Sequence, residues 1–463
     1  MNINAKEALK HWYRGISGIV ITGLILLLFE FVWKLDLNEL LYVRFLNKGN
    51  LLMLGVYAVL MVVFINAYGG YRIGVNRISN VILSQFLGIL SVNAIEVVMT
   101  ILMVGQVNDI GRIFSAYLKL SFYQTVVIFF LTWLMIVVYR RIFPPYRVLN
   151  IYGDYVNNLP AKMNARGDKY IVEGELSCHE GMEAIEKAIF DYDAVLINDV
   201  PSETRNKILK LCFDHGKRVY FTPKISDIII RGSDELKLFD TPVYYCRNIG
   251  LSFPQRFFKR LGDILVSLLG IILTSPIMLV TELAIHFYDK GPVFYKQTRC
   301  TVGGKEFRVL KIRSMIMDAE KDGVARLSTE NDSRITPVGK VIRATRIDEL
   351  PQFFNILKGD MSVVGPRPER PEIIQEYYEQ LPEFSYRLRV KAGLTGYAQV
   401  YGKYNTTSYD KLKLDLTYVE NYSLLLDIQL ILLTIKVIFQ KEATEGLEDG
   451  TTNAAMGQKK SGE

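Results

Sequence analysis

The chain has 463 residues, of which half are hydrophobic and 22% are charged, and its formal net charge is +7. A mean hydropathy of +0.16 is too high for an ordinary soluble enzyme, but the charged fraction is too high for a pure membrane bundle. These values exclude a disordered chain and a collagen-like fibre. The four cysteines are widely spaced without a CxxC pair, which excludes a disulfide framework and a zinc finger. No basic run marks a nucleic-acid surface, so we expect a membrane part joined to soluble domains.

The first third of the chain contains four long apolar segments, at 16–33, 51–68, 81–104 and 122–139. Each reaches the roughly 20 residues that a helix needs to cross the hydrocarbon core of a bilayer. Lys and Arg are moderately enriched before the first segment, between the second and third, and after the fourth, which favours both ends in the cytosol. We therefore predict a bundle of four transmembrane helices at 1–145, followed by a cytosolic remainder.

A soluble α/β domain is predicted at 146–250. Strand-like runs at 147–152, 194–197 and 218–221 alternate with helical patterns, which is typical of a parallel, Rossmann-like sheet. Gly153 follows the first strand, but a dinucleotide-binding fingerprint needs three glycines and only this one is present. We therefore favour a structural or regulatory domain and keep nucleotide binding as an alternative.

A fifth apolar run at 261–281 contains Ser275–Pro276 and has basic residues on both sides. Proline removes a backbone hydrogen bond and bends a helix, and basic flanks favour two cytosolic ends. We predict a re-entrant helix that enters the membrane, bends at Pro276 and returns; a kinked fifth crossing is the alternative. The last apolar stretch, 424–439, is predicted to be a helix in the interface or against the neighbouring domain, with a buried core helix as the alternative.

Polar motifs are concentrated between 293 and 442. In chain order they are KIRSM at 311–315, Arg343 with DELPQ at 348–352, GDMS at 359–362, VGPRP at 364–368 and KAGLTG at 391–396. The pair Asp348–Glu349 fits a hard cation such as Mg²⁺, or a carboxylate that attacks phosphorus. Taken alone, it also fits a solvated helix cap.

Cations in the other motifs suit phosphate. Arg367 lies between two prolines, so little backbone entropy is lost when it binds an anion, and Lys311 and Arg313 alternate on a predicted strand and share one face. A rigid loop and an exposed charged face are the ordinary explanations. Together with the membrane-dipping helix, the motifs indicate phosphoryl chemistry on an amphiphilic substrate.

From about 256 to 440, these motifs in this order resemble the catalytic domain of the monotopic phosphoglycosyl transferases, the bacterial sugar transferase family. With the upstream helices and Rossmann-like domain, the chain resembles the long form, the undecaprenyl-phosphate hexose-1-phosphate transferases. The resemblance implies a catalytic domain at 251–442. The residues that follow, 443–463, are polar, and we infer from this composition that they form a disordered tail. Ala392 and Ile312 depart from the family pattern, where Pro and Phe are usual.

The resemblance also implies roles for individual residues. Asp348 matches the nucleophile that attacks the β-phosphorus of a nucleotide diphosphosugar, and Glu349 matches the Mg²⁺-associated acid beside it. Arg343 and Arg367 match residues that bind phosphate or line the site, and Ser275–Pro276 match the break of the re-entrant helix. We further assign substrate binding to three residues of these motifs: Lys311, Arg313 and Asp360.

The predicted reaction transfers hexose-1-phosphate from a UDP-sugar to polyprenyl phosphate through a covalent aspartyl intermediate, and it releases UMP. It would prime exopolysaccharide or capsule synthesis at the cytosolic face of the bacterial inner membrane. The expected partners are the sugar donor, the lipid acceptor and the membrane, with no nucleic acid, and homodimerisation is kept as an expectation. The rival classes are a non-catalytic membrane scaffold, a NAD-binding membrane oxidoreductase, and a multi-spanning transferase without a covalent intermediate.

Overall fold

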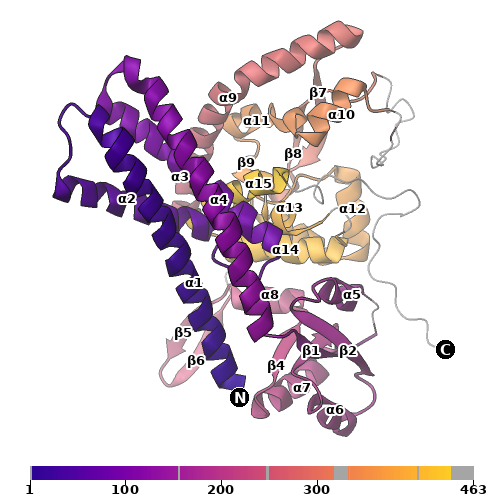
Figure 1. Cartoon of the computed structure of the whole chain (residues 1–463). Helices are drawn as coiled ribbons and strands as arrows, with labels where there is room; N and C mark the ends of the chain where they lie inside the picture. Colours follow the sequence, from indigo (N-terminus) through magenta and orange to yellow (C-terminus); the bar gives the residue numbers. More distant parts are fainter. Residues whose placement is uncertain are drawn as a thin grey trace. The chain divides into compact units, whose positions relative to one another are not determined.

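A computed structural model describes residues 3–154, 157–246, 250–317, 332, 334–403 and 406–439 (Figure 1). The contacts between Cα atoms divide the chain into two compact units, and the boundary along the sequence falls between Thr222 and Pro223. The predicted tail at 443–463 lies outside the described residues. Each unit is described separately below.

The first unit begins with four long helices, α1 (Ile3–Val32), α2 (Asn47–Tyr68), α3 (Ile78–Val104) and α4 (Ile110–Ile142). Each predicted apolar segment lies within one of them or extends past its end by a single residue, and each helix is long and apolar enough to cross a membrane. Helix α3 packs against α2 and α4, and α1 packs against α4. Buried hydrogen bonds join three of these helices: Tyr57 of α2 donates to Asn93 of α3 at 2.7 Å, and Gln124 of α4 donates to Tyr57 at 2.9 Å.

A parallel four-stranded sheet follows, in the order β2-β1-β3-β4. Its strands are β1 (Tyr146–Tyr152), β2 (Tyr170–Ser177), β3 (Ala194–Asn198) and β4 (Arg218–Phe221), and its helices are α5 (Leu159–Asn164), α6 (Met182–Ile189) and α7 (Ser202–Asp214). The sheet confirms the predicted parallel α/β arrangement. Strand β2 was not predicted, because it is an edge strand whose residues are half-buried or exposed and include Glu173 and Glu175.

Gly153 is explained by the packing of two strand ends. Its N–H donates to the carbonyl of Asn198 at 3.0 Å, and a Cβ at this position would overlap the carbonyl oxygen of Asp199. The glycine is therefore required where the ends of β1 and β3 approach each other. This packing accounts for the residue without a nucleotide.

The segment 223–246 clusters with the second unit, although we had assigned it to the middle domain. It forms α8 (Ile225–Arg231) and the antiparallel hairpin β5 (Asp234–Leu238) and β6 (Thr241–Tyr245). Ile228 packs with Leu412 and Leu416 of α14 (Ser408–Glu420), so α8 shares a core with the C-terminal helices.

The second unit contains the long helix α9 (Phe253–Asp289) and the antiparallel hairpin β7 (Phe294–Cys300) and β8 (Glu306–Ile312). Helix α9 is continuous through Pro276. Proline cannot donate to the carbonyl four residues earlier, which belongs to Ile272, and the Ser275 hydroxyl donates to that oxygen at 3.0 Å. The Ser275 hydroxyl thus replaces the donor that Pro276 lacks. The helix break predicted at Ser275–Pro276 is not found, since α9 continues through both residues.

The remaining elements surround a second core. They are α10 (Pro337–Ala344), α11 (Gln352–Lys358), β9 (Ser362–Val364), α12 (Pro371–Gln380), β10 (Gly393–Thr395), α13 (Tyr397–Tyr401), α14 and α15 (Leu424–Ile438). Strands β9 and β10 form a short parallel pair. Helix α15 confirms the helix predicted at 424–439: Leu430 is buried in the core of this unit, whereas Leu425 and Phe439 are exposed.

Candidate active site

The carboxylate pair lies in a short turn between two helices. After α10, Arg346 adopts a left-handed conformation with φ of +55°, and a 3₁₀ turn covers Ile347–Glu349. Helix α11 follows directly and packs on α9. The contact is close: the Phe353 ring of α11 lies against Gly270 of α9, where a Cβ would be only 2.7 Å from the ring. Arg260 of α9 also donates to the carbonyls of Ile356 and Leu357 at 2.6 and 2.8 Å, at the end of α11. Helix α9 thus fixes the element that follows the two acids.

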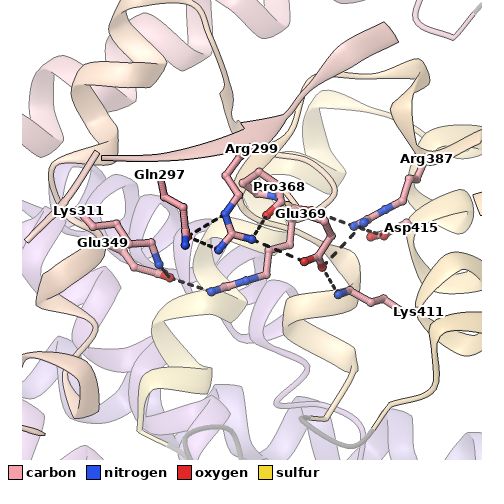
Figure 2. Close-up of polar contacts among 10 residues, drawn as sticks. Gln297, Arg299, Lys311, Glu349, Pro368, Glu369, Arg387, Lys411 and Asp415 are labelled. Atoms are coloured by element: carbon pink, nitrogen blue, oxygen red, sulfur yellow. Dashed lines mark hydrogen bonds and ion pairs between the residues drawn. The ribbon is translucent and has the colours of Figure 1, made fainter. Parts of the chain in front are cut away.

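Glu349 is surrounded by cations. Its Oε1 accepts a hydrogen bond from Lys311 at 3.3 Å (Figure 2) and one from Arg367 at 3.0 Å. Its Oε2 lies 3.8 Å from Arg346. Burial alone would raise the pKa of this carboxyl, but the charges of Arg367, Lys311 and Arg346 outweigh burial and hold the pKa well below its usual value. Glu349 is therefore ionised at neutral pH.

Asp348 differs from its neighbour. Among the described residues, no hydrogen bond or ion pair to its side chain is found. Burial and the adjacent charge of Glu349 raise the pKa of Asp348, although Lys311, Arg343 and Arg367 oppose this shift. Within the described part of the chain, Asp348 is thus a carboxylate without a hydrogen-bonding or ion-pair partner, next to one that several cations bind.

The loop that carries Arg367 is packed against the GLTG segment. The N–H of Gly365 donates to the Thr395 carbonyl at 2.8 Å, and the N–H of Gly393 donates to the Pro366 carbonyl at 2.9 Å. A Cβ at Gly365, Gly393 or Gly396 would overlap backbone atoms of the facing segment. The glycines therefore allow two backbones to meet, which brings the VGPRP and GLTG motifs together.

The structure thus gathers most of the predicted site residues, although it does not test their roles. Lys311, Glu349 and Arg367 are in contact, and Arg343 is close enough to Asp348 to affect its pKa. Arg313 is elsewhere: it is buried and binds the Asp289 carboxylate with contacts of 2.8 and 2.5 Å. Asp360 pairs with Lys358 at 3.0 Å. Neither Arg313 nor Asp360 contacts the carboxylate pair.

A small cavity opens beside Glu349. The residues that line it include Arg299, Lys311, Gln352, Arg367 and Gln399. A larger pocket of about 310 Å³ is lined by residues of α8, α13, α14 and α15 and shares none of these side chains. We take the small cavity as the candidate site, because Glu349 meets the cations Arg299, Lys311 and Arg367 there.

Comparisons with known proteins match the region of the chain that contains this candidate site. Residues 254–441 match the family described as bacterial sugar transferase. The chain is 37% identical over 182 residues to a UDP-glucose:undecaprenyl-phosphate glucose-1-phosphate transferase of Caulobacter vibrioides, with 38% of this chain and 68% of that protein aligned. The chain belongs to the bacterial sugar transferase family.

The alignments with two other relatives cover about half of each relative's length. A UDP-N-acetylgalactosamine-undecaprenyl-phosphate N-acetylgalactosaminephosphotransferase of Aeromonas hydrophila is 44% identical over 185 residues, which are 39% of this chain and 44% of that protein. An undecaprenyl-phosphate galactose phosphotransferase of Salmonella typhimurium is 36% identical over 245 residues, which are 49% of this chain and 50% of that protein. The chain thus spans about half the length of these two relatives.

The donor atoms of this sugar transferase site fit a magnesium ion. Mg²⁺ is usually held by one or two carboxylates together with substrate phosphates. Asp348 and Glu349 supply two carboxylates, and the one contact of Glu349 Oε2 with a described residue is that with Arg346 at 3.8 Å. Among the described residues, no group of three or more His, Cys, Asp or Glu side chains could hold a metal without a substrate.

Sequence reasoning missed a buried charge network behind Arg367. Its members are Arg299, Glu369, Arg387, Lys411 and Asp415 (Figure 2). Burial alone would raise the pKa of Glu369, but Lys411, Arg387 and Arg367 lower it to about 2. The one available signal was position, because Glu369 directly follows VGPRP and Arg387 lies four positions before Lys391, where KAGLTG begins.

Proposed function

We propose that the chain transfers hexose-1-phosphate from a UDP-hexose to undecaprenyl phosphate, releasing UMP and forming polyprenyl-diphospho-sugar. The observation that carries the proposal is Asp348, which has no hydrogen-bonding or ion-pair partner among the residues that the structure describes, beside the cation-bound Glu349. Both lie within the region that matches the sugar transferase family. The names of the relatives describe transfer of sugar phosphate to undecaprenyl phosphate, which supports the same donor and acceptor here.

In the proposed first step, an Asp348 oxygen bonds to the β-phosphorus of the donor. The bond from that phosphorus to the bridging oxygen breaks, and UMP leaves with the electron pair. In the second step, a phosphate oxygen of the acceptor attacks the same phosphorus and Asp348 leaves as a carboxylate. The acceptor is already an anion, so no strong general base is required, and positioning and charge neutralisation supply most of the catalysis.

The chain's own cations have a defined part in this scheme. Arg367 and Lys311 already bind one oxygen of Glu349 and line the cavity, so their remaining N–H groups can bind the diphosphate. Arg343 adds positive charge near Asp348. Mg²⁺, when bound through Glu349, would neutralise charge on the same phosphates.

The contacts of α9 support a site at the membrane surface. Its first half packs on other elements of the second unit through Val266 and Gly270. Its second half packs on the same unit through Met278 and Ile285, which contact Ile312 and its neighbours. A helix that crossed the membrane would place its two halves against different compartments. Contact of both halves with one unit therefore favours the re-entrant arrangement and a cytosolic site at the inner membrane.

Cysteine labelling tests this topology. In a Cys246→Ser background, Phe253→Cys and Tyr288→Cys would each place a thiol at one end of α9, at positions that are 74% and 53% exposed. We expect an impermeant maleimide to label both only in inside-out vesicles, because both ends are proposed to be cytosolic. Labelling of Tyr288→Cys from outside intact cells would instead indicate a fifth crossing. An engineered thiol in the loop between α1 and α2 serves as the external control.

A panel of UDP-sugars tests the activity. The relatives are named for glucose, galactose and N-acetylgalactosamine, so the panel contains these sugars and N-acetylglucosamine. We expect Mg²⁺-dependent release of UMP, with a polyprenyl-diphospho-sugar product, from at least one of them. Absence of UMP with every donor, in the presence of polyprenyl phosphate and Mg²⁺, would contradict the proposal.

A further inference from the structure

Every carbonyl group of the loop 366–369, which carries Arg367, is bound by a donor from outside the loop. For the carbonyls of residues 366, 367, 368 and 369 in turn, the donors are the Gly393 N–H at 2.9 Å, the Arg387 guanidinium at 3.0 Å, the Arg299 guanidinium at 3.2 Å and the Cys300 N–H at 3.0 Å. Pro366 and Pro368 fix two of the backbone φ angles in this loop. The remaining freedom is the orientation of the peptide planes, which these donors restrict.

Arg387 occupies a specific place in this arrangement. It lies on the 3₁₀ segment Pro382–Arg389 and is only 1% exposed, and its Nη2 atom lies 3.0 Å from the Arg367 carbonyl oxygen. The same Nη2 atom lies 2.7 Å from Asp415, which is also 1% exposed, and Nη1 lies 3.9 Å from Glu369. Arg387 and Asp415 do not line the cavity beside Glu349.

Stability is a weak explanation for such a pair. The desolvation of two buried charges often cancels their attraction, and apolar replacements of similar volume are frequently as stable. A guanidinium that binds a backbone carbonyl has a more specific effect, because it fixes the peptide plane from which the next side chain projects. Here the residue whose carbonyl is bound is Arg367, whose own guanidinium reaches Glu349 at 3.0 Å.

We propose that Arg387, held by Asp415, is a positioning residue that orients Arg367 for the phosphoryl transfer. This inference rests on the proposed function. Arg387 does not touch the reacting atoms, so its effect passes through the Arg367 backbone. By analogy with groups that orient metal ligands, whose alteration typically changes activity about ten- to a hundredfold, we expect an effect of that size here.

A double-mutant cycle between Arg387 and Arg367 tests the inference. Arg387→Lys keeps the positive charge beside Asp415 but cannot bind the carboxylate and the carbonyl with one planar group. We expect it to slow UMP release in the first half-reaction about ten- to a hundredfold. In an Arg367→Ala background, the same substitution should slow release by less than about threefold, because the side chain that it positions is absent.

The controls separate positioning from general damage. Arg389→Lys, two residues away on the same segment, alters an ion pair with Glu420 at 3.6 Å and should not change UMP release. Asp415→Asn provides a second route: it keeps Arg387 and should show the same dependence on Arg367, even if Arg387→Lys folds poorly. Equal losses in both backgrounds, for both variants, would overturn the inference. A wild-type enzyme that released no UMP would overturn the proposed function, and the inference with it.

Discussion

We expect the substitution Asp348→Asn to abolish UMP release. The wild-type protein, given a UDP-sugar and Mg²⁺ without lipid acceptor, should release about one equivalent of UMP per active site, as covalent catalysis requires. Asparagine keeps the size of the side chain but lacks the negatively charged oxygen that attacks phosphorus. Because the whole first step depends on this oxygen, the burst should fall by at least roughly a thousandfold. Rapid-quench measurement of UMP, and exchange of labelled UMP into UDP-sugar, both report this step.

A matched substitution provides the control for Asp348→Asn. Asp410→Asn changes the same chemical group on α14, where the side chain is 48% exposed and pairs with Lys413, so it should keep the full burst. If wild-type protein released UMP only after polyprenyl phosphate was added, and Asp348→Asn retained turnover, a direct displacement would replace the covalent mechanism.

The burst should also depend on pH with a definite sign. Only ionised Asp348 can attack, and burial together with the charge of Glu349 raises its pKa. The burst rate should therefore decline as pH falls through this raised pKa, at a higher pH than the value of about 3.9 for a free aspartate would give. Glu349→Gln removes the neighbouring charge, so it should lower the rate and move the acid limb of the profile to lower pH. An unchanged acid limb in this variant would contradict the coupling of the two acids.

Local sequence patterns predicted much of the site because its main parts lie in short motifs. Asp348 and Glu349 are adjacent, and Arg367 is fixed between two prolines, so their chemistry is visible without a structure. The long apolar helices and the alternating strands of the first unit are likewise periodic features. Lys311 reaches Glu349 from β8, which agrees with its predicted place on a strand face.

Arg313 shows where the periodic argument ends. The alternation of side chains holds only within a strand, and β8 ends at Ile312. The N–H of Arg313 donates instead to the carbonyl of Val293 at 2.8 Å, and its side chain turns to Asp289 at the end of α9. A difference of one residue in the strand end was enough to separate it from Lys311.

The network behind Arg367 depends on tertiary contacts that no local pattern encodes. Arg387 and Asp415 lie on separate elements, and charged residues are usually expected at the surface. Their burial follows from the packing of η6 (Pro382–Arg389) against α14. The glycines of GLTG also depend on a tertiary contact. Glycine permits another group to approach the backbone closely, but the sequence does not show that this group is the backbone of Gly365.

The loss of Lys259 should be among the most damaging changes to the second unit. Lys259 of α9 contacts Asp427 of α15 at 2.7 Å, and both side chains are less than 10% exposed. Tyr418 of α14 donates to the other carboxylate oxygen at 2.7 Å, so the group ties three helices together. Lys259→Ala leaves a buried carboxylate without its cation, which typically costs about 3–5 kcal/mol in the free energy of unfolding. Thermal unfolding in detergent or nanodiscs, followed with a probe in the second unit, measures the loss.

Two comparisons decide whether charge is the reason for this loss. The double variant Lys259→Met, Asp427→Leu removes both charges and fills similar volume, so it should recover most of the stability that Lys259→Ala loses. Lys358→Ala, also in the second unit, breaks a pair with Asp360 at 3.0 Å in which the lysine is 75% exposed, and it should change the unfolding temperature little because solvent screens that pair. A double variant as unstable as Lys259→Ala would show that the fit of the lysine stem, rather than the unpaired charge, holds the start of α9 to α15. In that case apolar packing, and not charge, would hold α9 in its place beside the carboxylate pair.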